Sequence, residues 1–345
     1  MNNGSRRRGR RKYKIRYDRI AAVAIVLIVL ILLLSSCVKG CSKKDDKDKK
    51  KDPPQSSVVD ELTTDPNAPP ASTPDSQNTD PNTPSQPGVT GAVSDSTVKS
   101  MEYSQINNGD LLLVNSLYPY KFQEGDASIT TVFDHRNDCY TTSDNIISLD
   151  QNTITQLNAL MEAYFNATSN KDLRIIGGYR TIEVQNDKYN NGKSKFQGGY
   201  SDYHTGRSFD IGIFPQGQNS NYYNAEGTYA WFAQNAASYG FIERYPSGKD
   251  SVTGEEARTY TYRYVGVPHA VYMKENNLCL EEYIEQIKSF SSSNPLTITS
   301  GTATYQVYYV AANANNVTDV PVPSNYSYTI SGNNSDGFIV TVTIA

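Results

Sequence analysis

Apolar and polar positions follow regular patterns through the second half of the chain. Between Asp150 and Asn166 apolar residues recur every three or four positions, which predicts an amphipathic helix with Asp150 as its N-cap. Apolar and polar residues alternate at 207–214 and 259–265, which predicts two strands, with Asp210 on the polar face of the first. Other expected strands are 111–114, 173–176, 305–311 and 326–345, and other expected helices follow Arg180 and span 226–239, 268–276 and 280–290.

The N-terminus has a different pattern. An unbroken apolar run spans 20–34 and extends through two serines and Cys37 to Val38, close to the length that crosses a bilayer, and nine basic residues precede it. We therefore expect a cytoplasmic segment at 1–19 and a single transmembrane anchor at 20–38, with the remainder of the chain outside the membrane. Two alternatives stay open: a cleaved signal peptide, and a lipoprotein signal that is acylated at Cys37.

Composition separates a linker from the folded region. Residues 39–100 are rich in Pro, Ser, Thr and Asp and poor in aromatic residues, which predicts a disordered tether. A domain at 101–292 and a β-rich extension at 293–345 follow, with a hairpin turn at 333–337. The net charge is −4, and the basic cluster flanks an apolar run, so we expect no nucleic-acid partner. Outside the membrane a Cys139–Cys279 disulfide is chemically possible, and two separate thiols are the alternative.

Three stretches of the chain carry a family resemblance: 178–189, which begins Gly-Tyr-Arg-Thr, 201–210, and 263–283, which begins Arg-Tyr-Val-Gly-Val-Pro-His. They resemble the VanY-type D-alanyl-D-alanine carboxypeptidases, zinc enzymes that trim peptidoglycan stem peptides. The resemblance implies an α+β fold with a central antiparallel sheet, flanking helices and, in this chain, a small C-terminal β extension.

The chain departs from the metal motifs of the family it resembles. In the first motif, Ser-x-His-x-x-Gly-x-x-x-Asp, Asp210 keeps the last ligand, but Tyr203 stands at the His position and His204 comes one residue late. In the second motif, Glu-x-Trp-His, Arg258 replaces the general base and Thr261 replaces the His ligand. An arginine stays charged and accepts no proton, and catalytic zinc sites of this class need three protein ligands. We therefore expect no bound cofactor, with His204 as a secondary candidate for a metal ligand.

The same resemblance implies a substrate-binding site. Arg180 stands where the family holds the terminal carboxylate of its substrate, and Gln185 and Ser201 would line the same cleft. Arg258 would add positive charge near Asp210 in place of zinc. Tyr203, Tyr260 and Tyr262 offer an aromatic binding surface for glycan or peptide, or simply reflect the tyrosine-rich composition.

Three functional hypotheses follow. The first is a membrane-anchored, cell-wall-facing pseudoenzyme that has lost zinc and binds stem peptides ending in D-Ala-D-Ala, or acts as a scaffold. The second is an active zinc D,D-carboxypeptidase in which His204 and a further ligand rebuild the site, with Glu255 or Glu256 as a base from a shifted register. The third is a protein-interaction domain without affinity for peptidoglycan.

Overall fold

The structure is a computed structural model that describes residues 96–122 and 128–344. Both ranges belong to the same compact unit of the chain. The predicted membrane anchor at 20–38, its basic flank and Cys37 lie outside the described residues. Within the described ranges no helix combines the length and the apolar character that a membrane span requires.

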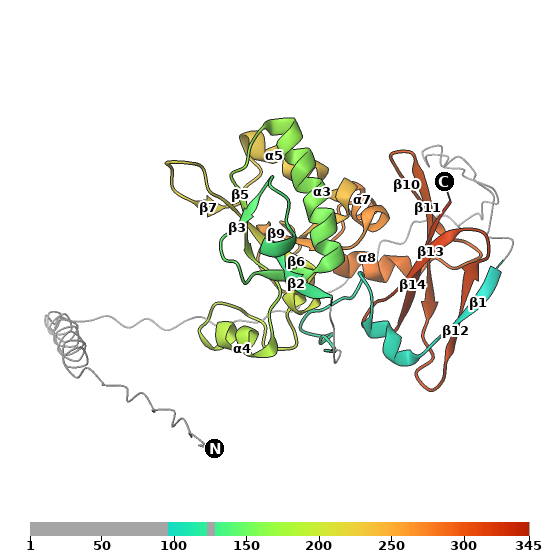
Figure 1. Ribbon diagram of the computed structural model, residues 1–345. Helices are drawn as coiled ribbons and strands as arrows, with labels where there is room; N and C mark the ends of the chain where they lie inside the picture. Colours follow the sequence, from blue (N-terminus) through green and yellow to red (C-terminus); the bar gives the residue numbers. More distant parts are fainter. Residues whose placement is uncertain (1–95, 123–127, 345) are drawn as a thin grey trace, which may run out of the picture. The chain divides into compact units, whose positions relative to one another are not determined.

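A mainly antiparallel sheet forms the centre of the fold (Figure 1). Its strands follow the order β3-β5-β6-β9-β8, and β7 pairs with the part of β6 that β9 leaves open. Among these strands β3 and β5 run parallel and the other neighbours run antiparallel. The predicted α+β class with a central antiparallel sheet is confirmed. The strands are β3 (Thr141–Thr142), β5 (Leu173–Gly177), β6 (Ser208–Ile213), β7 (Asn221–Tyr222), β8 (Phe241–Tyr245) and β9 (Arg258–Tyr264).

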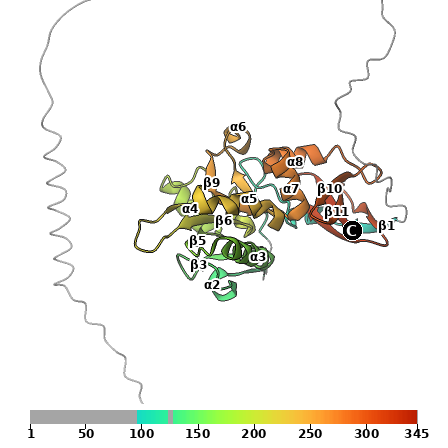
Figure 2. The same cartoon turned by 90° about the horizontal axis from the view of Figure 1, so that it is seen from above.

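Helix α3 (Gln151–Thr168) covers one face of this sheet, and Figure 2 shows it beside β5 and β3. The Asp150 side chain caps it by accepting a hydrogen bond from the Thr153 N–H at 3.1 Å, as the sequence predicts. Its buried stripe, which includes Leu157, packs in one core with Phe209 and Ile211 of β6. Because side chains alternate along a strand, Asp210 points to the opposite face of the sheet. The pattern of β6 thus separates the core from the site.

The helix expected at 226–239 is broken into three pieces: η3 (Gly227–Tyr229), α5 (Ala230–Asn235) and η4 (Ala236–Tyr239). The Tyr223 hydroxyl causes the first break. It donates to the Tyr229 carbonyl at 2.8 Å and accepts from the Ala233 N–H at 3.2 Å, so it stands between two groups that a continuous helix would join. Gly240 ends the segment in the left-handed region at φ 85°, as predicted.

The strand expected at 111–114 is absent from the described residues. Its carbonyl groups accept hydrogen bonds from buried side chains, two of them arginines and one Asn334, instead of from a neighbouring strand. Arg263 Nη2 donates to the carbonyls of Asp110 and Leu112, at 3.0 and 3.1 Å, and Arg244 Nη2 donates to the Val114 carbonyl at 3.3 Å. The apolar run is therefore buried without pairing in a sheet.

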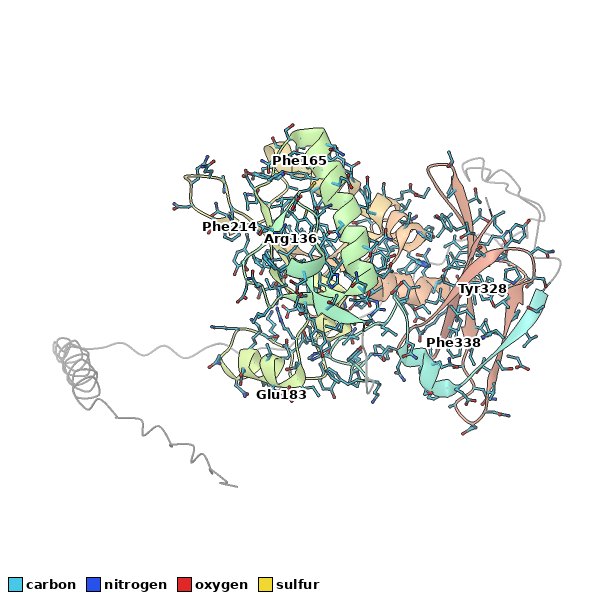
Figure 3. The ribbon with its side chains drawn as sticks, viewed as in Figure 1. Arg136, Phe165, Glu183, Phe214, Tyr328 and Phe338 are labelled. Carbon is cyan, nitrogen blue, oxygen red and sulfur yellow. The ribbon has the colours of Figure 1, made fainter. Side chains whose placement is uncertain are left out.

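The C-terminal extension is a second sheet of order β10-β11-β14-β13, with a ribbon of β1 and β12 beside it. Figure 3 labels Tyr328 and Phe338 on its strands. The predicted hairpin turn at 333–337 joins β13 to β14. Strand β1 begins at Ser96, inside the segment expected to be linker, and pairs with β12 along its whole length. The strands are β1 (Ser96–Met101), β10 (Leu296–Ser300), β11 (Ala303–Ala311), β12 (Thr318–Pro323), β13 (Ser327–Gly332) and β14 (Gly337–Thr343).

The extension and the peptidase-like region share a hydrophobic core. Tyr283 and Ile284 of α8 pack in one cluster with Val307 of β11 and Ile339 of β14. Buried His269 adds a polar connection, because its Nδ1 lies 2.6 Å from the Tyr283 hydroxyl and its Nε2 lies 3.0 Å from Thr341 Oγ1. The remaining elements are η1 (Tyr103–Asn107), β2 (Ile129–Thr131), α2 (Val132–His135), β4 (Ser148–Asp150), α4 (Ile182–Asn190), η2 (Asp202–Thr205), α6 (Asp250–Thr253), α7 (Val267–Glu275) and α8 (Leu280–Ile287).

The disulfide considered between Cys139 and Cys279 does not form, and both residues are free thiols. Cys279 is fully buried as the N-cap residue of α8, where its backbone N–H donates to Glu282 Oε2 at 2.9 Å. Cys139 instead packs against the core beneath the central sheet. The two thiols therefore belong to different parts of the fold.

Candidate functional site

Three side chains from different elements meet on the open face of the sheet. Tyr203 lies in the short helix η2, Asp210 lies in β6, and Thr261 stands directly opposite Asp210 in β9. The Tyr203 hydroxyl donates to Asp210 Oδ1 at 2.5 Å, and Thr261 Oγ1 donates to the same oxygen at 2.7 Å. The structure thus brings together the retained acid and the two residues that the sequence places at missing ligand positions.

Both hydroxyls are neutral donors. Burial raises the pKa of Tyr203 well above its usual value, and the nearby charge of Asp210 raises it further. Thr261 is fully buried as well. Asp210 Oδ1 thus accepts two O–H hydrogen bonds, which satisfy it as an acceptor. In a metal site the same carboxylate oxygen would bind the cation.

The donor set does not fit zinc. Zinc sites in proteins draw their ligands from cysteine, histidine and carboxylates, and this cluster supplies a single carboxylate. Across residues 96–122 and 128–344, no group of three or more His, Cys, Asp or Glu side chains could hold a metal ion. The three residues therefore meet at the position of the family's metal site, but only Asp210 among them is a zinc-binding residue type.

The His204 ring forms its hydrogen bonds with the backbone and not with Asp210. Its Nδ1 lies 2.6 Å from the Arg180 carbonyl and its Nε2 accepts from the Gly199 N–H at 2.9 Å, which requires the neutral tautomer with the proton on Nδ1. Burial lowers its pKa and favours that neutral form. The ring also packs against Tyr120 and Phe122. Because both nitrogens are engaged with the backbone, the secondary suggestion of a metal ligand at His204 finds no free lone pair.

Arg180 is the cation beside Asp210. It follows β5, where its Nη2 lies 3.7 Å from Asp210 Oδ2 and its guanidinium carbon lies 3.5 Å from the ring centre of Tyr203. Its Nη1 donates to Gln185 Oε1 at 3.1 Å. Buried Gln185 in turn donates to Ser194 Oγ and to the Phe196 carbonyl, so its amide fixes the arginine from behind. Ser201, also buried, precedes η2, where its carbonyl accepts from the His204 N–H at 3.0 Å.

Arg258, which the sequence analysis expected to add charge near Asp210, forms its ion pair with Glu255 in the structure. Its Nη2 forms an ion pair with Glu255 Oε2 at 2.7 Å, and its guanidinium lies over the Tyr245 ring. The ion pair uses one oxygen of Glu255, the residue that the sequence analysis considered as a general base from a shifted register, while Glu255 Oε1 is buried without a hydrogen-bond partner among the described residues. The position that aligns with the family's general base therefore holds an arginine that is paired with Glu255.

A buried charge cluster holds the site in place, and the sequence did not reveal it. Asp202 lies 2.5 Å from Arg263 Nη1 and 3.3 Å from Arg244 Nε, and it accepts a hydrogen bond from Ser208. Burial opposes the charged form of Asp202, but the two guanidiniums outweigh burial and hold its pKa below the usual value. Arg244 also forms two hydrogen bonds to Glu281 of α8. Because Asp202 precedes Tyr203, this cluster fixes η2 against β8 and β9. The one sequence feature that pointed to the cluster was Arg263, the first residue of the 263–283 stretch.

The predicted tyrosine surface is only partly present. Tyr203 and Tyr262 are buried, at 2% and 1% exposure. Tyr260 instead stacks on Tyr222 of β7, with ring centres 4.4 Å apart and planes 21° apart. Tyr222 is 63% exposed, so an aromatic pair does lie at the surface near the site.

Comparison with known proteins agrees with this fold. The family model of VanY, D-alanyl-D-alanine carboxypeptidase, matches residues 146–267. A D-alanyl-D-alanine carboxypeptidase of Enterococcus faecium is 31% identical over 265 residues, which span 73% of this chain and 81% of that protein. Another, of Enterococcus faecalis, is 30% identical over 136 residues, 33% of this chain and 48% of that protein.

A solved structure matches most of the chain. The vancomycin-resistance D,D-dipeptidase VanXYg, in complex with a D-Ala-D-Ala phosphinate analog, superposes with a TM-score of 0.63 at 27% identity. The match covers 72% of this chain and 99% of that chain. Fold and site together define a peptidase-like α+β domain. The chain belongs to the VanY family of D-alanyl-D-alanine carboxypeptidases.

Proposed function

We propose that this chain is a D-alanyl-D-alanine carboxypeptidase-like protein of the cell wall that has lost zinc and hydrolysis and binds peptidoglycan stem peptides. The observation that carries the proposal is the double hydrogen bond from Tyr203 and Thr261 to Asp210 Oδ1. Cleavage of an amide bond needs an activated water and a group that accepts its proton. The matching positions hold two neutral hydroxyls and an arginine that is paired with Glu255.

Arg180 supports the binding part of the proposal. A guanidinium has five N–H donors, and Gln185 takes one of them. The 3.7 Å separation from Asp210 is longer than a charge-assisted hydrogen bond of about 2.8 Å. Arg180 therefore keeps donors for the terminal carboxylate of a peptide.

Lys188 adds positive charge on the same side. It lies one helical turn after Gln185 on α4, the helix that carries Glu183 in Figure 3. Burial lowers the pKa of Lys188, and the charge of Arg180 lowers it further, which fits two cations that lie close together. Among the described residues none forms an ion pair with Lys188. An anionic peptide end would relieve this repulsion.

The proposal includes a location at the outer surface of the membrane, which rests on the sequence alone. An anchor at 20–38 or acylation at Cys37 would hold the chain there, with the predicted linker at 39–100 reaching toward the wall. This location matches a ligand that is part of peptidoglycan.

The experiment is calorimetric titration of the purified chain with a pentapeptide ending in D-Ala-D-Ala and with the same peptide as a C-terminal amide. We expect the acid to bind and the amide to bind at least about tenfold more weakly, because the amide lacks the charge that Arg180 recognises. Arg180→Ala should abolish binding of the acid. Lys171→Ala is the matched control, since it removes a cation at the far end of β5.

The three functional hypotheses give different results in this titration. Binding without release of D-alanine supports the proposal. Release of D-alanine that depends on added zinc favours the active carboxypeptidase. Absence of binding to either peptide favours an interaction domain without affinity for peptidoglycan.

A further inference from the structure

A cavity lies on the face of the central sheet that is turned away from Asp210. Its volume is about 180 Å³, and residues of β8, β9, η4 and α7 line it. One of them, Tyr262, follows Thr261 on β9, and successive residues of a strand point to opposite faces. Glu243 of β8 pairs directly with Tyr262, so its side chain shares this second face. The sheet therefore separates the cavity from Asp210 and its two hydroxyl donors.

Apolar side chains form most of the walls. Phe241 belongs to the main core and Met273 to the core shared with the C-terminal extension, so packing on both sides holds the walls in place. A cavity of about 150 Å³ admits a molecule the size of benzene, so this cavity has room for a ligand slightly larger than that. The apolar wall residues are Ala233, Ala236, Phe241, Ile242, Met273 and Leu278.

A carboxylate without a partner lies in the lining. Glu243 forms no hydrogen bond and no ion pair with any other described residue, although its side chain is half-buried at the cavity. Burial raises the pKa of Glu243 by more than the charge of nearby Lys274 lowers it. A positively charged group on a ligand would compensate this carboxylate, which the protein itself leaves without compensation.

Lys274 brings the opposite charge to the same cavity. Its Nζ donates to the Ala233 carbonyl at 3.3 Å and to the Gln234 carbonyl, both near the end of α5. A lysine ammonium has three N–H donors, so one donor remains. Glu243 and Lys274 form no ion pair with each other, yet the charge of each shifts the pKa of the other. The cavity thus presents a carboxylate and an ammonium that are close but separate.

We propose that this cavity binds a free amino acid with a small aliphatic side chain. The ammonium of the ligand pairs with Glu243, its carboxylate accepts from Lys274, and its side chain contacts Ala236 and Met273. A ligand with a single charge would leave one of the two protein charges unpaired. Because the cavity shares no residue with the cleft at Arg180, this site does not depend on the proposed function.

The test is a ligand-observed NMR titration of the purified chain with L-valine, with D-valine and with two analogues that share the branched side chain. Isobutylamine lacks the carboxylate of valine, and isovalerate lacks its ammonium. We expect saturable binding of valine in at least one of its two forms. Each analogue should bind at least about tenfold more weakly, because it loses one charge-assisted hydrogen bond.

Four variants assign the binding to this cavity. Glu243→Gln should weaken valine at least about tenfold and leave isovalerate unchanged, since isovalerate has no ammonium. Ala233→Leu fills the cavity from α5 without a change of charge and should abolish binding of valine. Glu275→Gln is the matched control, because it removes a carboxylate of α7 that does not line the cavity. Arg180→Ala, in the cleft, should also leave the affinity for valine unchanged.

The outcomes decide the proposal. If neither form of valine binds, or if either analogue binds as tightly as valine, the proposal is overturned. Wild-type affinity for valine in Glu243→Gln would overturn it as well, and this variant decides the matter if thermal unfolding shows that Ala233→Leu does not fold. Loss of valine binding in Arg180→Ala would assign the ligand to the cleft and would also overturn the site. The affinity for the D-Ala-D-Ala pentapeptide tests the proposed function separately.

Discussion

Removal of the Tyr203 hydroxyl tests whether the hydrogen bonds to Asp210 stabilise the fold in place of a metal. Tyr203→Phe keeps the ring that lies 3.5 Å from the Arg180 guanidinium and deletes only the donor at 2.5 Å from Asp210. A hydrogen bond to a charged group contributes about 1.5–3 kcal/mol. Thr261 still donates to the same oxygen at 2.7 Å, so we expect a loss near the middle of this range, about 2 kcal/mol.

Urea unfolding followed by the fluorescence of Trp231, the single tryptophan, measures this change. Trp231 packs against the main core, with its ring 6.1 Å from that of Tyr164, so its emission should report loss of the core. Tyr328→Phe on the C-terminal sheet is the matched control and should stay within about 0.5 kcal/mol of wild type.

Thr261→Val extends the test to the second donor. It should cost a similar amount, and the double variant Tyr203→Phe/Thr261→Val should deviate from the sum of the two by about 0.5 kcal/mol or more, because both donors share one acceptor. If Tyr203→Phe were as stable as wild type or more stable, the hydroxyl would not be part of a stabilising network, and the reasoning would be refuted.

Three further predictions concern other parts of the structure. Burial lowers the pKa of His269 to about 4. Between about pH 6.5 and pH 4 the unfolded chain therefore binds a proton at this histidine and the folded chain does not. The free energy of unfolding should fall by about 3 kcal/mol as the pH is lowered through that window. Urea titrations of His269→Gln should show a shallower fall with acid, and an unchanged slope would contradict the assignment. Replacing both hydroxyl residues, as Tyr203→His with Thr261→His, should create a His₂Asp set that binds one zinc ion in a dialysis assay, and adding Asp210→Asn should abolish that binding. Asp202→Asn should reduce the free energy of unfolding by about 3 kcal/mol or more, since it leaves two buried guanidiniums without their shared carboxylate, and a neutral result in thermal unfolding would show that the buried cluster is dispensable.

The elements that the sequence predicted correctly depend on local signals. Asp150 correctly predicted the start of α3, because N-capping is a contact between near neighbours in the chain. The alternation of β6 placed Asp210 opposite the core for the same reason. At the site, the spacing of two motifs identified the positions that meet at Asp210, although the sequence alone did not show that Tyr203 and Thr261 both donate to it.

The features that sequence patterns missed depend on partners far away in the chain. Tyr223 interrupts a helix by inserting its hydroxyl into the backbone hydrogen bonds. Strand β1 is polar enough to resemble linker, and it is ordered by pairing with β12 near the other end of the chain. The sequence did not show that Arg258 forms an ion pair with Glu255. Local periodicity carries no information on such contacts.

We propose above all that this member of the VanY family has exchanged its metal for hydrogen bonds around Asp210. The most direct test measures zinc per chain by mass spectrometry on the purified protein, together with D-alanine release from a D-Ala-D-Ala pentapeptide in the presence of added zinc. We predict far less than one zinc per chain and no release above that of an Asp210→Asn variant. One zinc per chain, with D-alanine release that the variant lacks, would contradict it.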